Sequence, residues 1–182
     1  ILKNLKLKIE ENHPMIRSIV IDREGPEKNL DHDLIDIFFE KAVNYDSKLR
    51  RDHQIRCIGI DEETTGLILD FIKEKEKVAT FSLPWIMTIE KHPNSVINMP
   101  IILLGYDGTP EVMIQISNLY NTTFGEITYK ETQMDGPPVQ DPDIWIPLHR
   151  DYWNGLLKKY NKSCTDDMPI IVEEFNFIFA QK

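Results

Sequence analysis

The fold is decided most clearly by the stretch Pro100-Ile-Ile-Leu-Leu-Gly-Tyr-Asp-Gly-Thr-Pro-Glu-Val-Met-Ile-Gln-Ile-Ser117. Its two apolar runs, residues 100–104 and 112–117, have the length and composition of β-strands. Between them lies Asp107-Gly108, a dipeptide that readily adopts the positive φ angles of a tight hairpin turn. The stretch therefore predicts an antiparallel β-hairpin.

Segments on both sides of this hairpin are expected to add strands and helices. Strands are predicted where apolar residues run together or alternate, at residues 15–21, 55–60, 124–130 and 169–180. Helices are predicted where apolar residues recur at three- and four-residue steps, at residues 30–50 and 148–160 and within 1–12. Asn29 or Asp31 is placed to cap the helix at 30–50, and Lys48, Arg50 and Arg51 are expected at its end.

Two further segments carry mixed signals. In residues 62–77, Thr64-Thr65-Gly66 favours a turn, whereas the run from Lys73 to Lys77 favours a helix. We favour a hairpin there and keep a helix as the alternative. Residues 134–147 contain four prolines, which favour an extended loop of limited freedom.

The order of these elements predicts an α+β fold. Because the strands group in the middle of the chain instead of alternating with helices, we expect a largely antiparallel sheet with helices packed mainly on one face. The length of 182 residues suits a single globular domain spanning residues 1–182. The chain opens at Ile1 and not at a methionine, so a fragment of a longer protein and a removed targeting segment both stay open.

The composition is acidic, because 21 Lys and Arg stand against 30 Asp and Glu, for a formal net charge of −9. Such a surface repels phosphate backbones, so we do not expect nucleic acid as a partner. It suits steered association with a basic protein partner, although excess acid also serves solubility alone. The sequence shows neither an apolar run of about 18 residues nor a signal peptide, so we expect a cytoplasmic protein without a membrane partner.

The sequence shows no motif for a cofactor or a metal ion. P-loop, dinucleotide-binding and paired-histidine patterns are absent, so we expect neither group. Cys57 and Cys164 lie too far apart for a CxxC pattern, and Cys57 is expected as a small core residue. A single disulfide between the two cysteines stays open.

The string Asp61-Glu-Glu-Thr-Thr-Gly-Leu67 follows the predicted strand at residues 55–60. It resembles the first motif of the DnaQ-like 3′–5′ exonucleases, Asp-x-Glu-Thr-Thr-Gly-Leu. The resemblance implies a metal-dependent nuclease or phosphodiesterase in which Asp61 and Glu63, together with Glu126, bind metal ions that position water and phosphate. The later motifs of that family have no clear match, and a solvated turn rich in Glu and Thr explains the string as well.

Residues 137–153 combine prolines with Trp145, Arg150, Tyr152 and Trp153. Trp, Tyr and Arg dominate interface hot spots, and a segment stiffened by proline loses little entropy on binding. We therefore expect a non-enzymatic protein-binding domain of the regulatory, adaptor or inhibitor type, with these four side chains as its binding residues. Two alternatives stay open. The tryptophans can anchor the segment to the core, and the domain can sense a small ligand in a cavity beneath residues 134–147.

Overall fold

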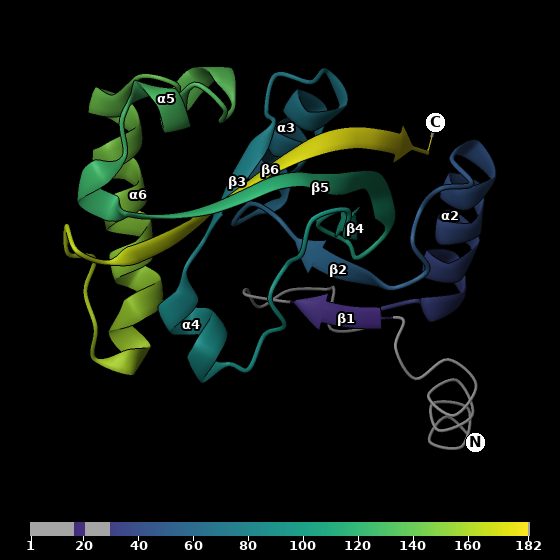
Figure 1. The fold of residues 1–182 in the computed structure, drawn as a ribbon, viewed down its shortest axis with the longest axis horizontal. Helices are drawn as coiled ribbons and strands as arrows, with labels where there is room; N and C mark the ends of the chain where they lie inside the picture. The colour runs from purple at the N-terminus through teal and green to yellow at the C-terminus, as the bar shows by residue number, and fades with distance from the viewer. Residues whose placement is uncertain (1–16, 21–29, 182) are drawn as a thin grey trace.

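The computed structural model describes residues 17–20 and 30–181, and a six-stranded mixed sheet runs through it (Figure 1). The strand order is β1-β2-β4-β5-β6-β3. The strands are β1 Arg17–Val20, β2 His53–Cys57, β3 Ala79–Ser82, β4 Pro100–Leu104, β5 Pro110–Thr123 and β6 Pro169–Ala180. The first three strands in the sheet pair in parallel, and the other three pairings are antiparallel.

The β4–β5 hairpin is confirmed. Ile101 pairs with Ile114 and Leu103 with Val112, so apolar side chains face each other along the ladder. In the turn, the Gly105 N–H donates to the Thr109 carbonyl at 2.8 Å, and Gly108 has the positive φ of 86° that favours glycine. The strand predicted at residues 169–180 is confirmed as β6, which pairs with β5 along most of its length.

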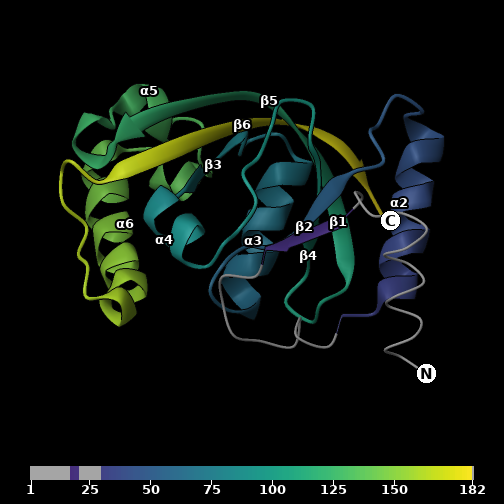
Figure 2. The same ribbon diagram turned by 60° about the horizontal axis from the view of Figure 1, so that its bottom comes forward.

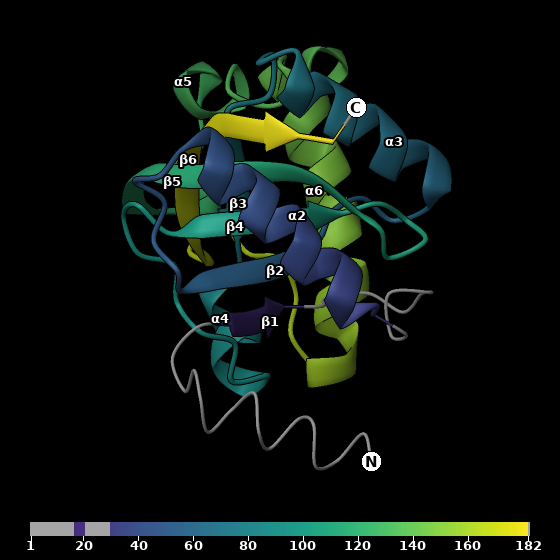
Figure 3. The same ribbon diagram turned by 90° about the vertical axis from the view of Figure 1, so that its right-hand side faces the viewer.

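Within residues 30–181, five helices pack around this sheet. They are α2 His32–Tyr45, α3 Glu62–Lys73, α4 Pro84–Ile89, α5 Tyr129–Thr132 and α6 Pro142–Leu157. In Figure 2, α6, α4 and α3 follow one another beneath the arch of β5 and β6, and these three helices surround one cavity. Helix α2 covers the opposite face of the central strands and stands in front of the sheet in Figure 3. The α+β class is thus confirmed.

Alternation along β4 explains how the sheet is covered on two sides. Ile102 and Leu104 pack in the cluster that contains Ile35 and Phe38 of α2. Their neighbours Ile101 and Leu103 pack in the cluster that contains Leu69 and Ile72 of α3. Because successive side chains of a strand point to opposite faces, one buried strand provides core on both sides.

Helix α2 begins where the sequence predicts but ends earlier. The Asp31 carboxylate accepts from the backbone N–H groups of Asp33 and Leu34 at 3.0 and 3.1 Å, so Asp31 is the N-cap. The helix ends at Tyr45, because Asp46 takes an extended backbone conformation and its side chain accepts from the Lys48 N–H at 3.0 Å. The basic residues expected at the helix end therefore lie beyond it.

The prediction of a hairpin at residues 62–77 is wrong, since this segment forms α3. Asp61 and Thr64 cap the helix reciprocally: the Thr64 N–H donates to Asp61 Oδ1 at 2.8 Å, and the Asp61 N–H donates to Thr64 Oγ1 at 3.2 Å. The Thr65 hydroxyl donates to the Ile58 carbonyl at 2.8 Å. Thr64 and Thr65, which favoured a turn in the sequence, therefore stabilise the first turn of α3 by hydrogen bonds.

The strand predicted at residues 124–130 is also wrong. Strand β5 ends at Thr123, and the chain continues as a 3₁₀ turn, Phe124–Glu126, followed by α5. Two glutamates reach back to cap these turns. Glu126 Oε2 accepts from the Thr123 N–H at 3.2 Å, and Glu131 Oε2 accepts from the Thr128 N–H at 2.9 Å. These local bonds replace the ladder bonds that an extended strand would need.

The extended loop predicted at residues 134–147 is wrong in its second half, because α6 begins at Pro142. Pro142 occupies the first turn, where a missing N–H costs nothing, and Asp141 Oδ1 accepts from the Asp143 N–H at 2.9 Å. Pro147 lies inside the helix and leaves the Asp143 carbonyl without its usual donor. Both residues are exposed, so water can solvate that carbonyl.

Cys57 and Cys164 are both buried, and no disulfide joins them. Strand β1 falls within the segment predicted at residues 15–21, whereas β2 is shifted from 55–60 to His53–Cys57. The helical spacing within residues 1–12 lies outside the described residues. Within the described ranges, no helix has both the length and the apolar character needed to cross a membrane.

Candidate functional site

A cavity of about 840 Å³ lies between α3, β3, α4 and α6. Its floor includes side chains of the sheet, and its walls are the inner faces of the three helices. Most of the wall is apolar, including Ile68, Phe71, Ile86, Tyr152, Leu156 and Phe175. The cavity therefore forms only when the sheet and the three helices pack together, because each wall comes from a different part of the chain.

Helix α3 approaches the segment before α6 closely at a glycine. A Cβ atom at Gly136 would lie 2.7 Å from Cδ2 of Phe71, which is inside van der Waals contact. Glycine at this position thus lets the Phe71 ring pack directly on the backbone. Both residues line the cavity, so this contact fixes part of its wall.

The first polar cluster on the wall centres on the Asp135 carboxylate. Asp135 Oδ1 accepts from Lys77 Nζ and from the Gly136 N–H at 2.7 Å, and Oδ2 accepts from Trp145 Nε1 at 2.9 Å. Burial alone would raise the pKa of Asp135, but the Lys77 ammonium and these hydrogen bonds outweigh it and hold the pKa below its ordinary value. Asp135 is therefore a charged carboxylate that fixes Lys77 and Trp145, and with one donor on Oδ2 this oxygen can still accept a second hydrogen bond.

His149 lies beside this carboxylate, one helical turn after Trp145. Its ring stacks on the Trp145 ring with centroids 3.7 Å apart and an interplanar angle of 18°. His149 Nδ1 lies 2.9 Å from the Trp145 carbonyl oxygen, and Nε2 lies 3.8 Å from Asp135 Oδ2. Burial lowers the pKa of His149 to about 4 against the opposing effect of Asp135, so the imidazole is neutral at pH 7 and the 3.8 Å contact is not an ion pair.

A second polar cluster lies at the strand end of the cavity. Arg56 on β2 donates through Nη1 to Glu173 Oε2 on β6 at 2.6 Å. Ser82 Oγ donates to Glu173 Oε2 at 3.0 Å, and Ser95 Oγ donates to Oε1 at 2.5 Å. Burial would raise the pKa of Glu173, but Arg56 and these donors keep it below the ordinary value. This ion pair links strands that are not neighbours in the sheet.

The structure separates the four binding residues predicted from the sequence. Trp145 and Trp153 are 0% and 3% exposed, and both pack with Phe124 in the core around α6. Arg150 lies with its guanidinium 4.5 Å above the Phe124 ring and donates to the Cys164 carbonyl and to Asp166. Tyr152 and Trp153 line the cavity, so two of the four belong to its wall.

Lys77, Asp135 and His149 were not predicted as site residues. Lys77 ends a charged run typical of a solvated helix, and Asp135 precedes a Gly-Pro-Pro sequence typical of a loop. One signal was available for His149, because it follows Trp145 by four residues and shares its helix face once the segment is taken as a helix. Because its prolines led us to predict a loop up to residue 147, the shared helix face of Trp145 and His149 was not recognised.

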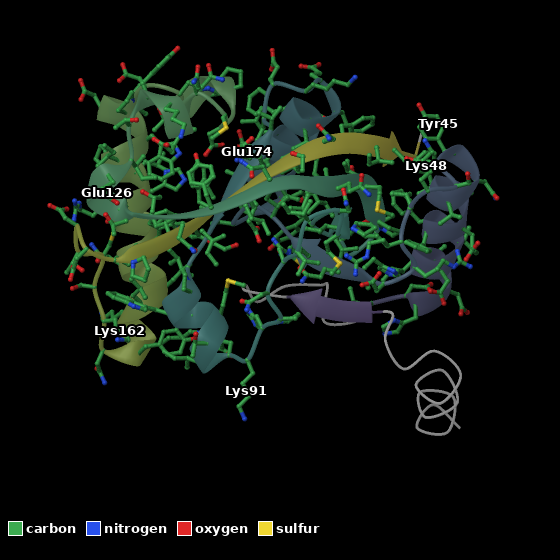
Figure 4. The ribbon with its side chains drawn as sticks, in the orientation of Figure 1. Tyr45, Lys48, Lys91, Glu126, Lys162 and Glu174 are labelled. Carbon is green, nitrogen blue, oxygen red and sulfur yellow. The ribbon has the colours of Figure 1, made fainter. Side chains whose placement is uncertain are left out.

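The residues of the exonuclease-like string serve the start of α3. Asp61 is the N-cap described above, and Glu63 lies exposed in the first turn. Glu126 caps the turn after β5 and lies at the α6 end of the molecule in Figure 4, far from Tyr45 at the α2 end. Among the described residues, no three His, Cys, Asp or Glu side chains are arranged to hold a metal ion. The nuclease alternative stays a prediction.

Fold and cavity together define a small α+β domain with a helix-lined cavity. Comparison with protein families then identifies the family: residues 56–179 match the model of the ASCH domain, and the chain belongs to this family. No curated protein sequence matches the chain.

Two solved structures share the fold. The ASCH domain from Lactobacillus crispatus has a TM-score of 0.75 at 16% identity, with 82% of this chain and 96% of that chain covered. A protein of the DUF984 family from Enterococcus faecalis has a TM-score of 0.72 at 15% identity, with 81% and 90% covered. At such low identity, these similarities establish the fold alone.

Proposed function

We propose that the protein binds a small organic molecule in the cavity between α3, α4 and α6. The observation that carries the proposal is the cavity itself, whose volume of about 840 Å³ suits an organic ligand. A mostly apolar wall with a few placed polar groups is the usual composition of such sites. This proposal develops the alternative of a small-ligand sensor, whose cavity was expected beneath residues 134–147.

The polar groups on the wall are suited to orient a ligand. Lys77 lines the cavity with only 6% of its side chain exposed, and its ammonium has three donors, of which one is given to Asp135. His149 adds a neutral ring whose Nε2 is an acceptor. A donor and an acceptor fixed beside one carboxylate can recognise a ligand by the pattern of its polar edge.

A variant that blocks the cavity tests the proposal. Leu148 lines the cavity and is 48% exposed, so Leu148→Trp adds bulk to the wall at little cost in stability. Leu34→Trp is the matched control, because Leu34 is 46% exposed on α2 at the other face of the sheet. A fragment library is screened by thermal shift and ligand-observed NMR. We expect fragments that bind the wild type and Leu34→Trp but lose at least about tenfold in affinity to Leu148→Trp.

The contrary result is equally clear. If no fragment in the library binds the wild type, or if the fragments bind Leu148→Trp as well as the control, the cavity is not a ligand site.

Protein binding remains a second candidate, supported by exposed apolar side chains on α6. Ile144 and Leu148 are each 48% exposed, and the Arg150 side chain on the same helix is 39% exposed. Because Trp145 and Trp153 are buried and Arg150 holds Phe124, Cys164 and Asp166, the exposed Ile144 is the better test of an interface. Ile144→Ser should weaken capture of a protein partner with little change in melting temperature; a lower melting temperature with unchanged capture would reject this candidate.

A further inference from the structure

We infer that the cavity takes a neutral molecule that donates an amide or amino N–H to His149 Nε2, beside the Asp135 carboxylate. The inference rests on the proposed function and names the chemical class of its ligand. It follows from three features of the cavity wall: the tautomer of His149, the position of a second acceptor, and the pairing of the two buried cations.

The tautomer of His149 is determined by its backbone partner. His149 Nδ1 lies 2.9 Å from the Trp145 carbonyl oxygen, and a carbonyl oxygen can only accept a hydrogen bond. Nδ1 therefore carries the proton, and in the neutral ring Nε2 presents a lone pair. Stacking on Trp145 and an edge contact with Trp153 at 5.1 Å hold the ring in this orientation.

A second acceptor lies next to this lone pair. Asp135 Oδ2 is 3.8 Å from His149 Nε2, and both residues line the cavity. Two acceptors at this separation repel each other unless a donor is shared between them. A ligand N–H is such a donor, whereas a ligand ester or carboxylate oxygen would add a third acceptor. The pair thus selects for a donor at this point of the ligand.

The charges on the wall select against an anion. Lys77 and Arg56 are the buried cations among the described lining residues, and each is paired with a buried carboxylate, Asp135 and Glu173 respectively. An anionic ligand would therefore lie close to the Asp135 carboxylate, while the charges of Lys77 and Arg56 are already balanced by Asp135 and Glu173. Burying such a charge costs far more than burying a neutral amide.

Three probes of nearly equal size separate these possibilities. Benzamide is neutral and offers N–H donors, methyl benzoate is neutral without a donor, and benzoate is an anion. Their dissociation constants are measured at pH 7 by ligand-observed NMR and calorimetry. We expect benzamide to bind the wild type at least about tenfold more tightly than methyl benzoate, because the loss of one donor leaves a buried acceptor unsatisfied, and benzoate to bind most weakly.

Two variants assign the preference to His149. His149→Phe keeps an aromatic ring against Trp145 but has no acceptor, so the preference for benzamide should disappear. His149→Gln keeps an amide oxygen near the position of Nε2 and should retain most of it. If His149→Phe does not fold, the ¹⁵N resonance of His149 Nε2 in the wild type replaces it, and benzamide but not methyl benzoate should shift that resonance.

The outcomes separate the inference from the proposed function. Equal affinities for benzamide and methyl benzoate, or a preference that survives in His149→Phe, would overturn the donor inference while leaving a ligand cavity in place. Tighter binding of benzoate would overturn the claim of a neutral ligand. If none of the three probes binds, the inference fails, and the library screen with Leu148→Trp decides the proposed function independently.

Discussion

At the scale of single residues, the protein places charged and polar groups in its interior and pairs nearly all of them. Lys77 with Asp135 and Arg56 with Glu173 are ion pairs whose side chains are at most 11% exposed. Such pairs contribute little net stability compared with apolar residues, yet breaking one is costly. Three of the four side chains, Lys77, Asp135 and Arg56, line the cavity, where they are placed to act in the proposed ligand recognition.

The pH dependence of unfolding tests the buried, neutral state of His149. Its pKa is about 4 in the folded protein, against an ordinary 6.5, so the unfolded chain binds more protons between these values and stability falls as the pH falls. From pH 7 to pH 4.5, the wild type should lose about 2 kcal/mol more unfolding free energy than His149→Phe. Urea unfolding at both pH values measures this. The depressed pKa values of Asp135 and Glu173 lower stability as the pH falls through and below their ordinary values, and both proteins share this contribution, so it cancels in the comparison.

Equal pH dependence in the two proteins would mean that His149 is as accessible to protons in the folded state as in the unfolded chain.

Removal of one partner tests the buried ion pair. Asp135→Asn leaves the Lys77 ammonium, 6% exposed, without an anion, and should lower the unfolding free energy by about 3–5 kcal/mol. Asp70→Asn is the control, because Asp70 is 67% exposed in its contact with Lys73 and should cost less than about 1 kcal/mol. Denaturant titration compares the two, and similar small losses would show that Lys77 is solvated.

At the scale of elements, sequence patterns succeeded where one local signal dominated. The Asp-Gly turn between β4 and β5 and the Asp31 cap of α2 were both predicted, because each depends on few neighbouring atoms. The failures share a cause. At Thr64 and Pro147, residues that disfavour helices on average occupy positions where they are tolerated or serve as caps, and tertiary packing decides the outcome.

The cap of α3 gives a prediction at this scale. Asp61→Ala removes the side chain that accepts from the Thr64 N–H, and it should lower the unfolding free energy by about 1 kcal/mol. Glu63→Ala is a matched change at an exposed position of the same turn and should stay within about 0.5 kcal/mol. Chemical denaturation provides the values. Cleavage of single-stranded DNA or RNA with Mg²⁺ that is lost in both variants would instead favour the nuclease alternative.

At the scale of the whole molecule, the sequence predicts the fold class but not the cavity. The α+β class follows from the order of elements, and membership in the ASCH domain family agrees with it. The cavity cannot be predicted from the order of elements, because Lys77, Asp135 and His149 meet only after β3, α5 and α6 pack together. Separations of 58 and 14 residues leave no spacing pattern that a sequence motif could reveal.

Fluorine NMR of protein labelled with 5-fluorotryptophan tests the central claim, a ligand in the cavity, most directly. Trp153 lies on the cavity wall and Trp145 supports it, whereas Trp85 on α4 is not among the lining residues and has Lys162 above its ring. On titration with the tightest fragment, the Trp153 and Trp145 resonances should shift and saturate together, with a smaller change at Trp85. A shift confined to Trp85, or no shift at saturating fragment, would contradict the account.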